Sequence, residues 1–199
     1  MEKIIYILLL YPLLSFSQLR DSIRIKTKVY EIMYSETLEE PLWVIYNVQC
    51  SEGDISRKGL DFYINDSIKT SDDKDYSFND FDKGHMAPAA DFNCNTSYLH
   101  ETFSYLNCAL QHKKLNRGVW KSLEMYEREL SKTHKVKVII KLKFSPRSKK
   151  LKTGAYVPDG FYKTLYLIDN SHPPKYQTIK YYFPNTAPES NKLSDYIIK

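Results

Sequence analysis

The sequence predicts an α+β domain in which strands come both before and after one well-defined helix. Residues 42–48 are rich in β-branched and aromatic side chains, which favours a buried strand. Residues 136–144 alternate between apolar and lysine side chains for most of their length, which is typical of a strand with one buried face. Between these strands, four apolar residues recur at helical spacing, namely Val119, Leu123, Tyr126 and Leu130. Strands on both sides of one strong helix indicate the α+β class.

Before the helix, short apolar runs alternate with polar segments. Residues 51–80 are polar and acidic, which indicates a long surface loop, and a short strand is expected within it at residues 62–64. Thr96 or Ser97 has the side chain needed to cap a short helix that leads towards Tyr105. The other strands expected in this half of the chain lie at residues 28–33 and 103–109.

The start of the strong helix and the elements after it complete the predicted domain. Asn116 is expected to be the N-cap, because its side-chain oxygen can accept a hydrogen bond from a free backbone amide. Glu127 and Glu129 are expected on the solvent side, opposite the apolar residues. Further strands are expected at residues 161–168 and 176–183, and the start of another at 195–198.

The first seventeen residues have the pattern of a secretory signal peptide. Lys3 supplies a positive start, residues 4–14 are apolar, and Ser15-Phe16-Ser17 is a small-x-small cleavage site before Gln18. The apolar run is too short to span a bilayer as an anchor. We therefore expect cleavage after Ser17 and a secreted or periplasmic mature protein, residues 18–199, that is a single domain without membrane contact.

Charge and cysteine content restrict the partners and the chemistry. The formal net charge is +5 at pH 7, which favours a polyanionic partner, either nucleic acid or an anionic envelope polymer. Export permits a disulfide among Cys50, Cys94 and Cys108, and all three pairings stay open. One thiol is then free or pairs between chains. The cysteines lack the close spacing of a cysteine-based metal site.

Residues 81–124 contain the side chains of a metal-assisted hydrolytic centre. His85 can take a proton from water, because a neutral imidazole is available near pH 7, and an unperturbed histidine would lose this role below pH about 6.5. Asn116 offers an amide oxygen and Glu124 a carboxylate. Taken singly, each has a plainer interpretation: a structural histidine, a helix cap and a solvated charge.

The order of these residues resembles that of a known nuclease family. Asp82-Lys83-Gly84-His85 resembles the Asp-Arg-Gly-His signature of the DNA/RNA non-specific endonucleases, which have the ββα-metal (His-Me finger) fold. The resemblance extends over roughly residues 28–183, and its specific blocks are Met86-Ala87-Pro88, Ala90-Asp91, residues 102–111 and residues 115–124. It implies a central antiparallel sheet with the metal-site helix packed on it.

The resemblance also implies roles for individual residues. His85 would be the general base, and Asn116 would be the single protein ligand of Mg²⁺, with Mn²⁺ or another divalent ion as alternatives. Glu124 would hold metal-bound water from the next layer. Arg57 would steady the transition state, although the loose alignment leaves Lys58 as an alternative.

Other residues of the motifs would bind substrate or shape the site. Lys83 stands at the family's arginine position, where it keeps the charge but lacks the bidentate fork that suits a phosphate. Lys83 and Arg117 would contact substrate, while Asp82 would order the turn and Asn107 would help to shape the site. The basic run of residues 141–152 is either a phosphate-tracking surface or a solvated loop.

The sequence therefore predicts a secreted, metal-dependent, sugar-non-specific endonuclease that cleaves DNA and RNA independently of sequence. The alternatives are a nucleic-acid-binding protein of the same fold with weakened catalysis, and a phosphodiesterase that acts on another anionic polymer. The chain ends at Lys199 where relatives continue, so we expect that either the C-terminal part is shortened or the sequence is a truncated reading frame. Preference for DNA or RNA, oligomeric state and biological role stay open.

Overall fold

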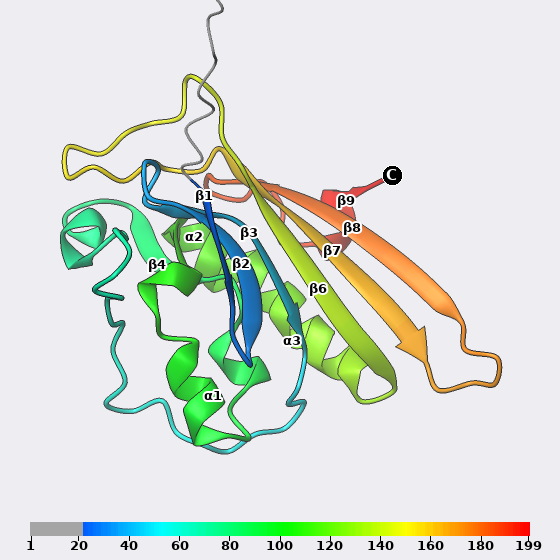
Figure 1. Cartoon of the computed structure of the whole chain (residues 1–199). Helices are drawn as coiled ribbons and strands as arrows, with labels where there is room; N and C mark the ends of the chain where they lie inside the picture. The colour runs from blue at the N-terminus through cyan, green and yellow to red at the C-terminus, as the bar shows by residue number, and fades with distance from the viewer. Residues whose placement is uncertain (1–21) are drawn as a thin grey trace, which may run out of the picture.

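A seven-stranded antiparallel sheet forms the centre of the fold, with strand order β1-β2-β3-β6-β7-β8-β9 (Figure 1). The computed structural model describes residues 22–199, so the predicted signal peptide and its cleavage site lie outside the described residues. The strands are β1 (Ser22–Lys26), β2 (Tyr30–Ser35), β3 (Glu40–Asn47), β6 (His134–Lys143), β7 (Gly160–Asp169), β8 (Tyr176–Pro184) and β9 (Ile197–Ile198). The predicted α+β class with an antiparallel central sheet is confirmed.

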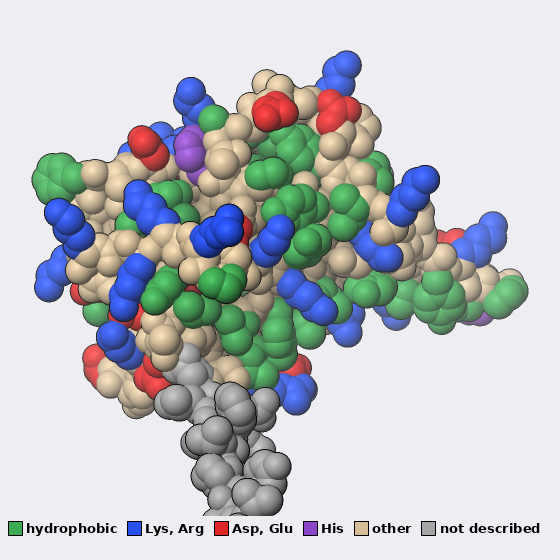
Figure 2. All heavy atoms as spheres, turned by 90° about the horizontal axis from the view of Figure 1, so that it is seen from above, with side chains coloured by type: hydrophobic (Ala, Val, Ile, Leu, Met, Phe, Trp, Pro, Cys, Tyr) green, Lys and Arg blue, Asp and Glu red, His purple; other side chains and the backbone are tan. Residues whose placement is uncertain are grey.

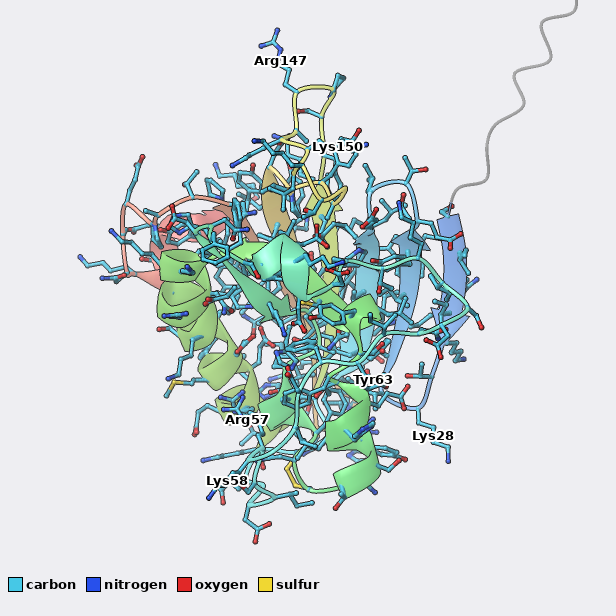
Figure 3. All side chains as sticks on the ribbon, turned by 90° about the vertical axis from the view of Figure 1, so that its left-hand side faces the viewer. Lys28, Arg57, Lys58, Tyr63, Arg147 and Lys150 are labelled. Atoms are coloured by element: carbon cyan, nitrogen blue, oxygen red, sulfur yellow. A yellow bond between two sulfur atoms is a disulfide. The ribbon has the colours of Figure 1, made fainter. Side chains whose placement is uncertain are left out.

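Only one face of this sheet is buried. On β6, Val136, Val138 and Ile140 are buried, while the lysines that alternate with them are exposed. The helices α1 (Thr96–Glu101), α2 (Lys113–Leu115) and α3 (Lys121–Ser131) all lie on the buried side (Figures 1 and 3). The alternation of β6 follows from this one-sided packing, because successive side chains of a strand point to opposite faces.

A second, two-stranded antiparallel sheet precedes α2 and α3, and α1 lies in the connection between its two strands. It consists of β4 (Phe81–His85) and β5 (Cys108–His112), and its register pairs His85 with Cys108. The chain passes directly from β5 into α2 and on to α3. This β-β-α order places the last residue of β4 beside the helical segment, which is the arrangement that the ββα-metal fold requires.

Two expected element boundaries in front of the helix are wrong. The strand expected at residues 103–109 is β5, which begins only at Cys108, because Tyr105–Asn107 forms a 3₁₀ turn capped by the Ser104 hydroxyl. The expected cap of α1 is Asn95 rather than Thr96 or Ser97, and its side chain accepts a hydrogen bond from the Tyr98 amide.

The helix that carries Asn116 also begins earlier than expected. Lys113 starts α2, and His112 Nδ1 caps it by accepting a hydrogen bond from the Lys114 amide at 3.2 Å. Asn116 has helical backbone angles and continues the segment, with a kink at Gly118, so its predicted role as N-cap is wrong. Because an earlier residue caps the helix, the Asn116 side chain is available for another contact.

The disulfide joins Cys50 to Cys94, with a Cα–Cα distance of 5.8 Å. Cys108 is the free thiol among the described cysteines; it is buried and its sulfur lies 3.1 Å from the Tyr76 hydroxyl. The bridge closes the start of the 51–80 loop onto the segment between β4 and α1. Among residues 22–199, no helix has both the length and the apolarity needed to cross a membrane.

Removal of the disulfide is expected to destabilise the protein by about 2–4 kcal/mol, because a bridge between residues 44 positions apart restricts the unfolded chain. Urea unfolding of the Cys50→Ser/Cys94→Ser variant against the unmodified protein measures this free energy. Cys108→Ser is the matched control and should retain the bridge. Mapping that linked Cys108 to either other cysteine would contradict the assignment.

Candidate active site

A cleft of about 470 Å³ lies where the end of β4 faces the helical segment. Its lining residues are Arg57, His85, Pro88, Ala89, Ala90, Asn116, Arg117, Lys121, Glu124 and Arg128. His85 from the end of β4 and Asn116 and Glu124 from the helical segment therefore face one space. Lys83, Asp82 and Asn107 were also predicted to belong to the site, but they are not among the lining residues.

The helical side of the cleft is a single stripe of charged residues. Lys121, Glu124 and Arg128 follow one another at spacings of three and four residues, which places them on one face of α3, and Arg117, four residues before Lys121 and across the kink at Gly118, lines the same cleft. Sequence reasoning missed Lys121 and Arg128, although this spacing from Arg117 and Glu124 would have found them. Arg128 also donates to the buried Asp91 carboxylate at 2.9 Å. The excess of positive charge suits an anionic ligand.

Two residues of the motifs hold the end of β4 in position. A Cβ atom on Gly84 would lie 2.5 Å from Gln111 Oε1 and 2.6 Å from Gln111 Cβ, so only glycine allows β4 and β5 to approach this closely. The buried Asn107 side chain accepts a hydrogen bond from the Ala87 amide at 2.8 Å and donates to the Ala87 and Thr102 carbonyls at 2.9 Å. Both contacts fix the chain on either side of His85.

The His85 imidazole is packed between aromatic rings. Its centroid lies 4.7 Å from that of Phe62 and 4.9 Å from that of Phe103, and Nε2 is buried without a hydrogen-bond partner. Nδ1 is therefore the ring nitrogen left to meet water in the cleft. Burial lowers the pKa of His85 to about 3, and the charge of Arg57 acts in the same direction. The expectation that this histidine becomes charged near pH 6.5 is therefore wrong, and the ring is neutral at pH 7.

Asp82 orients the Asn116 amide. Asp82 Oδ2 accepts hydrogen bonds from Asn116 Nδ2 at 3.0 Å and Arg117 Nε at 2.8 Å, and Oδ1 accepts one from Arg117 Nη2 at 2.6 Å. Burial alone would raise the pKa of Asp82, but the hydrogen bonds from Arg117 and Asn116 lower it. Because the amide nitrogen is bound to a carboxylate, Asn116 Oδ1 is the atom that can bind a cation in the cleft.

The surroundings of Glu124 act on the pKa of its carboxyl group in opposite directions. Burial raises the pKa of its carboxyl group to about 7, whereas the positive charge of Lys163 acts against this rise and Glu127 adds to it. Both protonation states are therefore populated near neutral pH. Only the ionised form can accept hydrogen bonds from metal-bound water with both oxygens.

A buried ion pair supports this part of α3. Glu127 and Lys163 are both 0% exposed, and Lys163 Nζ lies 2.9 Å from Glu127 Oε1. Tyr46 donates to Glu127 Oε2 at 2.7 Å, and Lys163 Nζ lies 4.4 Å from the centroid of the Trp120 ring. The expectation that Glu127 faces solvent is wrong, because a lysine of β7 and a tyrosine of β3 supply its partners.

Arg57 reaches the cleft because its loop is tied to the segment after β4. Asn93 donates to the Gly53 carbonyl at 2.9 Å and accepts a backbone hydrogen bond from Ile55 at 3.1 Å, next to the disulfide. Lys58 is not among the residues that line the cleft, and Figure 3 shows it further out than Arg57 at the same end of the molecule. The structure therefore favours Arg57 over Lys58.

Lys83 lies beside the cleft rather than in its lining. It forms ion pairs with Asp73 and, at 3.3 Å, with Asp61. Its Nζ is 5.4 Å from the ring centroids of Phe62 and Tyr105. Lys83 was predicted to contact phosphate. In this conformation its ammonium group is instead paired with two carboxylates of the 51–80 loop.

The basic run of residues 141–152 lies far from Arg57. Figure 3 places Arg147 and Lys150 at the upper end of the molecule and Arg57 and Lys58 at the lower end. Figure 2, which views the upper end, shows that lysine and arginine side chains predominate over acidic ones there. This run therefore does not form a wall of the cleft.

The donor set of the cleft fits a hard divalent cation. Among residues 22–199, no group of three or more His, Cys, Asp or Glu side chains could hold a metal. A cation in the cleft would therefore have few protein ligands, with Asn116 Oδ1 as the donor and the Glu124 carboxylate facing the same space. Mg²⁺ suits such a site, because it prefers oxygen ligands and retains several waters.

The chain is similar to known nucleases. The profile of the DNA/RNA non-specific endonuclease family matches residues 15–199. Mitochondrial endonuclease G of Bos taurus is 32% identical over 110 residues, which are 53% of this chain and 37% of that protein. Mitochondrial nuclease EXOG of Danio rerio is 33% identical over 105 residues, which are 50% and 31% of the two chains. The matched part is thus about a third of each relative.

A solved structure resembles the whole domain. The crystal structure of the EndoG/EndoGI complex, described as showing the mechanism of EndoG inhibition, contains a chain with a TM-score of 0.77 and 25% sequence identity. The superposition covers 88% of this chain and 80% of that chain.

The charge of Arg57 predicts a measurable effect on His85. Arg57→Gln should raise the His85 pKa while leaving it below the ordinary value of 6.5, because burial remains. NMR titration of the histidine ring carbons in the metal-free protein measures the shift. Lys58→Gln is the matched control, with the same loss of charge one residue away, and should change the midpoint much less. Equal shifts in both variants would contradict the placement of Arg57.

Proposed function

The chain belongs to the DNA/RNA non-specific endonuclease family, and from this premise we propose that it hydrolyses phosphodiester bonds of DNA and RNA in a metal-dependent reaction. The observation that carries the proposal is the meeting of His85, Asn116 and Glu124 in one cationic cleft. A neutral imidazole, an oriented amide oxygen and a carboxylate are the groups that water activation at a phosphate requires.

His85 acts as the general base in this proposal. Its ring is neutral at pH 7, because burial lowers its pKa to about 3, so it is competent to accept a proton from water without prior deprotonation. A base with so low a pKa is weak in its own right, since general-base catalysis is most efficient when the pKa lies near the working pH. The water that it deprotonates must therefore be acidified by its surroundings in the cleft.

Asn116 and Glu124 organise the other half of the reaction. Asn116 Oδ1 would hold the divalent ion, which when bound supplies Lewis acidity and neutralises charge on the phosphate. The Glu124 carboxylate orients water by accepting its hydrogen bonds. Arg57, Arg117 and Lys121 attract the phosphate and offset charge that develops in the transition state.

The lining of the cleft supports cleavage that is independent of base and sugar. The charged residues that face it are suited to phosphate, and Pro88, Ala89 and Ala90 are the small apolar residues opposite them. Among the described residues that line the cleft there is no Phe, Tyr or Trp. Contacts to phosphates position the polymer and carry no direct sequence information.

An exported location is part of the proposal. It rests on the signal-peptide pattern of residues 1–17 and is supported by the Cys50–Cys94 bridge, because disulfides persist in oxidising compartments. The mature chain, residues 18–199, would then act as a single domain outside the cytoplasm.

A binding protein with weakened catalysis is the second candidate. The observation that favours it is the engagement of Lys83 by Asp61 and Asp73, which neutralises the cation at the family's arginine position. This candidate predicts salt-dependent binding of nucleic acid without cleavage.

The direct test incubates the protein with plasmid DNA and with RNA in Mg²⁺, and then in excess EDTA. We expect both polymers to be cut in Mg²⁺ and protected by EDTA. His85→Ala should lower the rate by roughly 10²–10⁴-fold with little change in binding, as expected for loss of a general base. His134→Ala, at the start of β6, is the control and should cut normally. Intact polymers in Mg²⁺ would refute the catalytic proposal and favour the binding protein.

The pH dependence separates His85 from Glu124. Because the raised pKa of Glu124 is about 7, its carboxylate is lost as pH falls through 7, whereas His85 stays neutral down to about pH 3. We expect kcat/KM to fall about tenfold per pH unit below pH 7. In Glu124→Gln the remaining activity should be lower but flat between pH 5.5 and about 8. An acid limb that persisted in this variant would belong to another group.

A further inference from the structure

The exposed face of strands β6, β7 and β8 carries tyrosine and lysine side chains in a regular pattern. We define this tyrosine–lysine face by Lys137, Lys141, Tyr162, Tyr166, Lys180 and Tyr182, all of which alternate with core residues along their strands. Tyr162 is 38% and Tyr166 41% exposed. Within residues 22–199 the helices lie on the opposite face of the sheet, so this surface faces solvent (Figures 1 and 3).

The strand register interleaves the two residue types. Lys141 is the cross-strand partner of Tyr162, and Tyr162 is the partner of Tyr182. One position along the same face, Ile139 pairs with Thr164, which pairs with Lys180. Directly opposite side chains of antiparallel strands are near neighbours, so each aromatic ring lies beside a positive charge.

The rings and the cations also contact one another. The Tyr162 and Tyr182 rings have centroids 4.7 Å apart, and Lys143 Nζ lies 5.4 Å from the centroid of Tyr182. A groove of about 250 Å³ runs between Tyr162 and Tyr166, with Thr164 between them, and its sides are formed by Lys141 and Lys180 together with Ile139 and Ile198. The groove therefore has aromatic ends, and a lysine stands on each of its sides next to an isoleucine.

Acidic side chains are almost absent from these strands. In the described structure, β6 and β8 contain no Asp or Glu, and β7 contains only its last residue, Asp169. Asp169 is bound to Ser171 and to the Lys175 amide at the end of the strand. The lysines of the face therefore have no acidic partners on their own strands, so the face attracts an anion. A second copy of the same face is disfavoured, because lysines would then oppose lysines.

We propose that the tyrosine–lysine face is a second binding surface for single-stranded nucleic acid, on the side of the sheet opposite α3. The lysines would contact phosphates, and Tyr162 and Tyr166 would stack on bases exposed by the absence of a complementary strand. Alternating aromatic and cationic side chains favour single strands, since every base offers a flat face and every linkage a charge. If this face holds the polymer during cleavage, that role rests on the proposed function. Binding of single strands to the face does not depend on it.

The test measures binding of a fluorescent 20-nucleotide single strand, as DNA and as RNA, by anisotropy in EDTA so that the strand stays intact. Lys141→Glu/Lys180→Glu should weaken binding at least tenfold and reduce the slope of log affinity against log salt by about 1.4, since each phosphate contact contributes about 0.7 for single strands. Lys74→Glu/Lys192→Glu is the matched control, with the same charge change on exposed lysines outside the face, and should stay within twofold.

The tyrosines are tested separately. Tyr162→Ala/Tyr166→Ala should weaken binding about fivefold or more, as expected for lost stacking, with an unchanged salt slope. Equal effects of both lysine pairs, or no effect of the tyrosine variant, would overturn the proposal. Binding to vesicles of phosphatidylcholine and phosphatidylserine that depended on the same residues would overturn it in favour of a membrane surface. Thermal unfolding checks that each variant is folded.

Hydrolysis of a nitrophenyl phosphodiester of a single nucleoside distinguishes this proposal from the proposed function. Such a substrate is small enough to occupy only the cleft, so the lysine and tyrosine variants should hydrolyse it at the rate of the unmodified protein. If no variant hydrolyses it while the binding pattern holds, the proposed function fails and the second surface stands. If hydrolysis is normal and strand binding is the same in all variants, the second surface fails alone.

Discussion

The buried ion pair between Lys163 and Glu127 is the interaction on which the geometry of the cleft depends. It joins β7 to α3. Because both side chains are buried away from water, each charge needs the other as its partner. The Tyr46 hydroxyl donates to the other Glu127 oxygen, and the Trp120 ring lies against Lys163 Nζ. Loss of one member of such a pair costs about 3–5 kcal/mol, because the other charge is left buried alone. The pair thereby fixes the helix on which Lys121, Glu124 and Arg128 are arranged.

The pKa values of His85 and Glu124, which both face the cleft, are shifted in opposite directions by the same cause. Burial disfavours the charged form of any group, so it lowers the pKa of His85 and raises that of Glu124. The neighbouring charges act differently at the two groups. Arg57 lowers the pKa of His85 further, whereas Lys163 counteracts the rise in the pKa of Glu124. The result is a base that is neutral above about pH 3 beside a carboxyl group that titrates near neutral pH, which is the separation of roles that acid–base chemistry uses.

The large sheet divides the molecule into two electrostatic surfaces. Its buried side supports the helix and the β4–β5 pair that form the cleft, while its exposed side presents the tyrosine–lysine face. One strand, β7, contributes to both, because Lys163 points inward and Tyr162 and Tyr166 point outward. Because side chains of β7 alternate between the two faces of the sheet, the same strand holds α3 in place on one side and forms part of the proposed polymer-binding surface on the other.

Local pattern and motif order in the sequence determined the α+β class, the main strands and the identity of His85, Asn116 and Glu124 as the central groups. These properties are encoded in residues close together in the chain, as strand alternation, helical spacing and consecutive motif residues. Tertiary structure alone decided which cysteines pair, that Arg57 rather than Lys58 faces the cleft, that Lys83 binds two aspartates beside it, and that Glu127 is buried. Each of those outcomes depends on a partner far away in the sequence, and single-residue patterns contain no information about which distant partner will neutralise a charge.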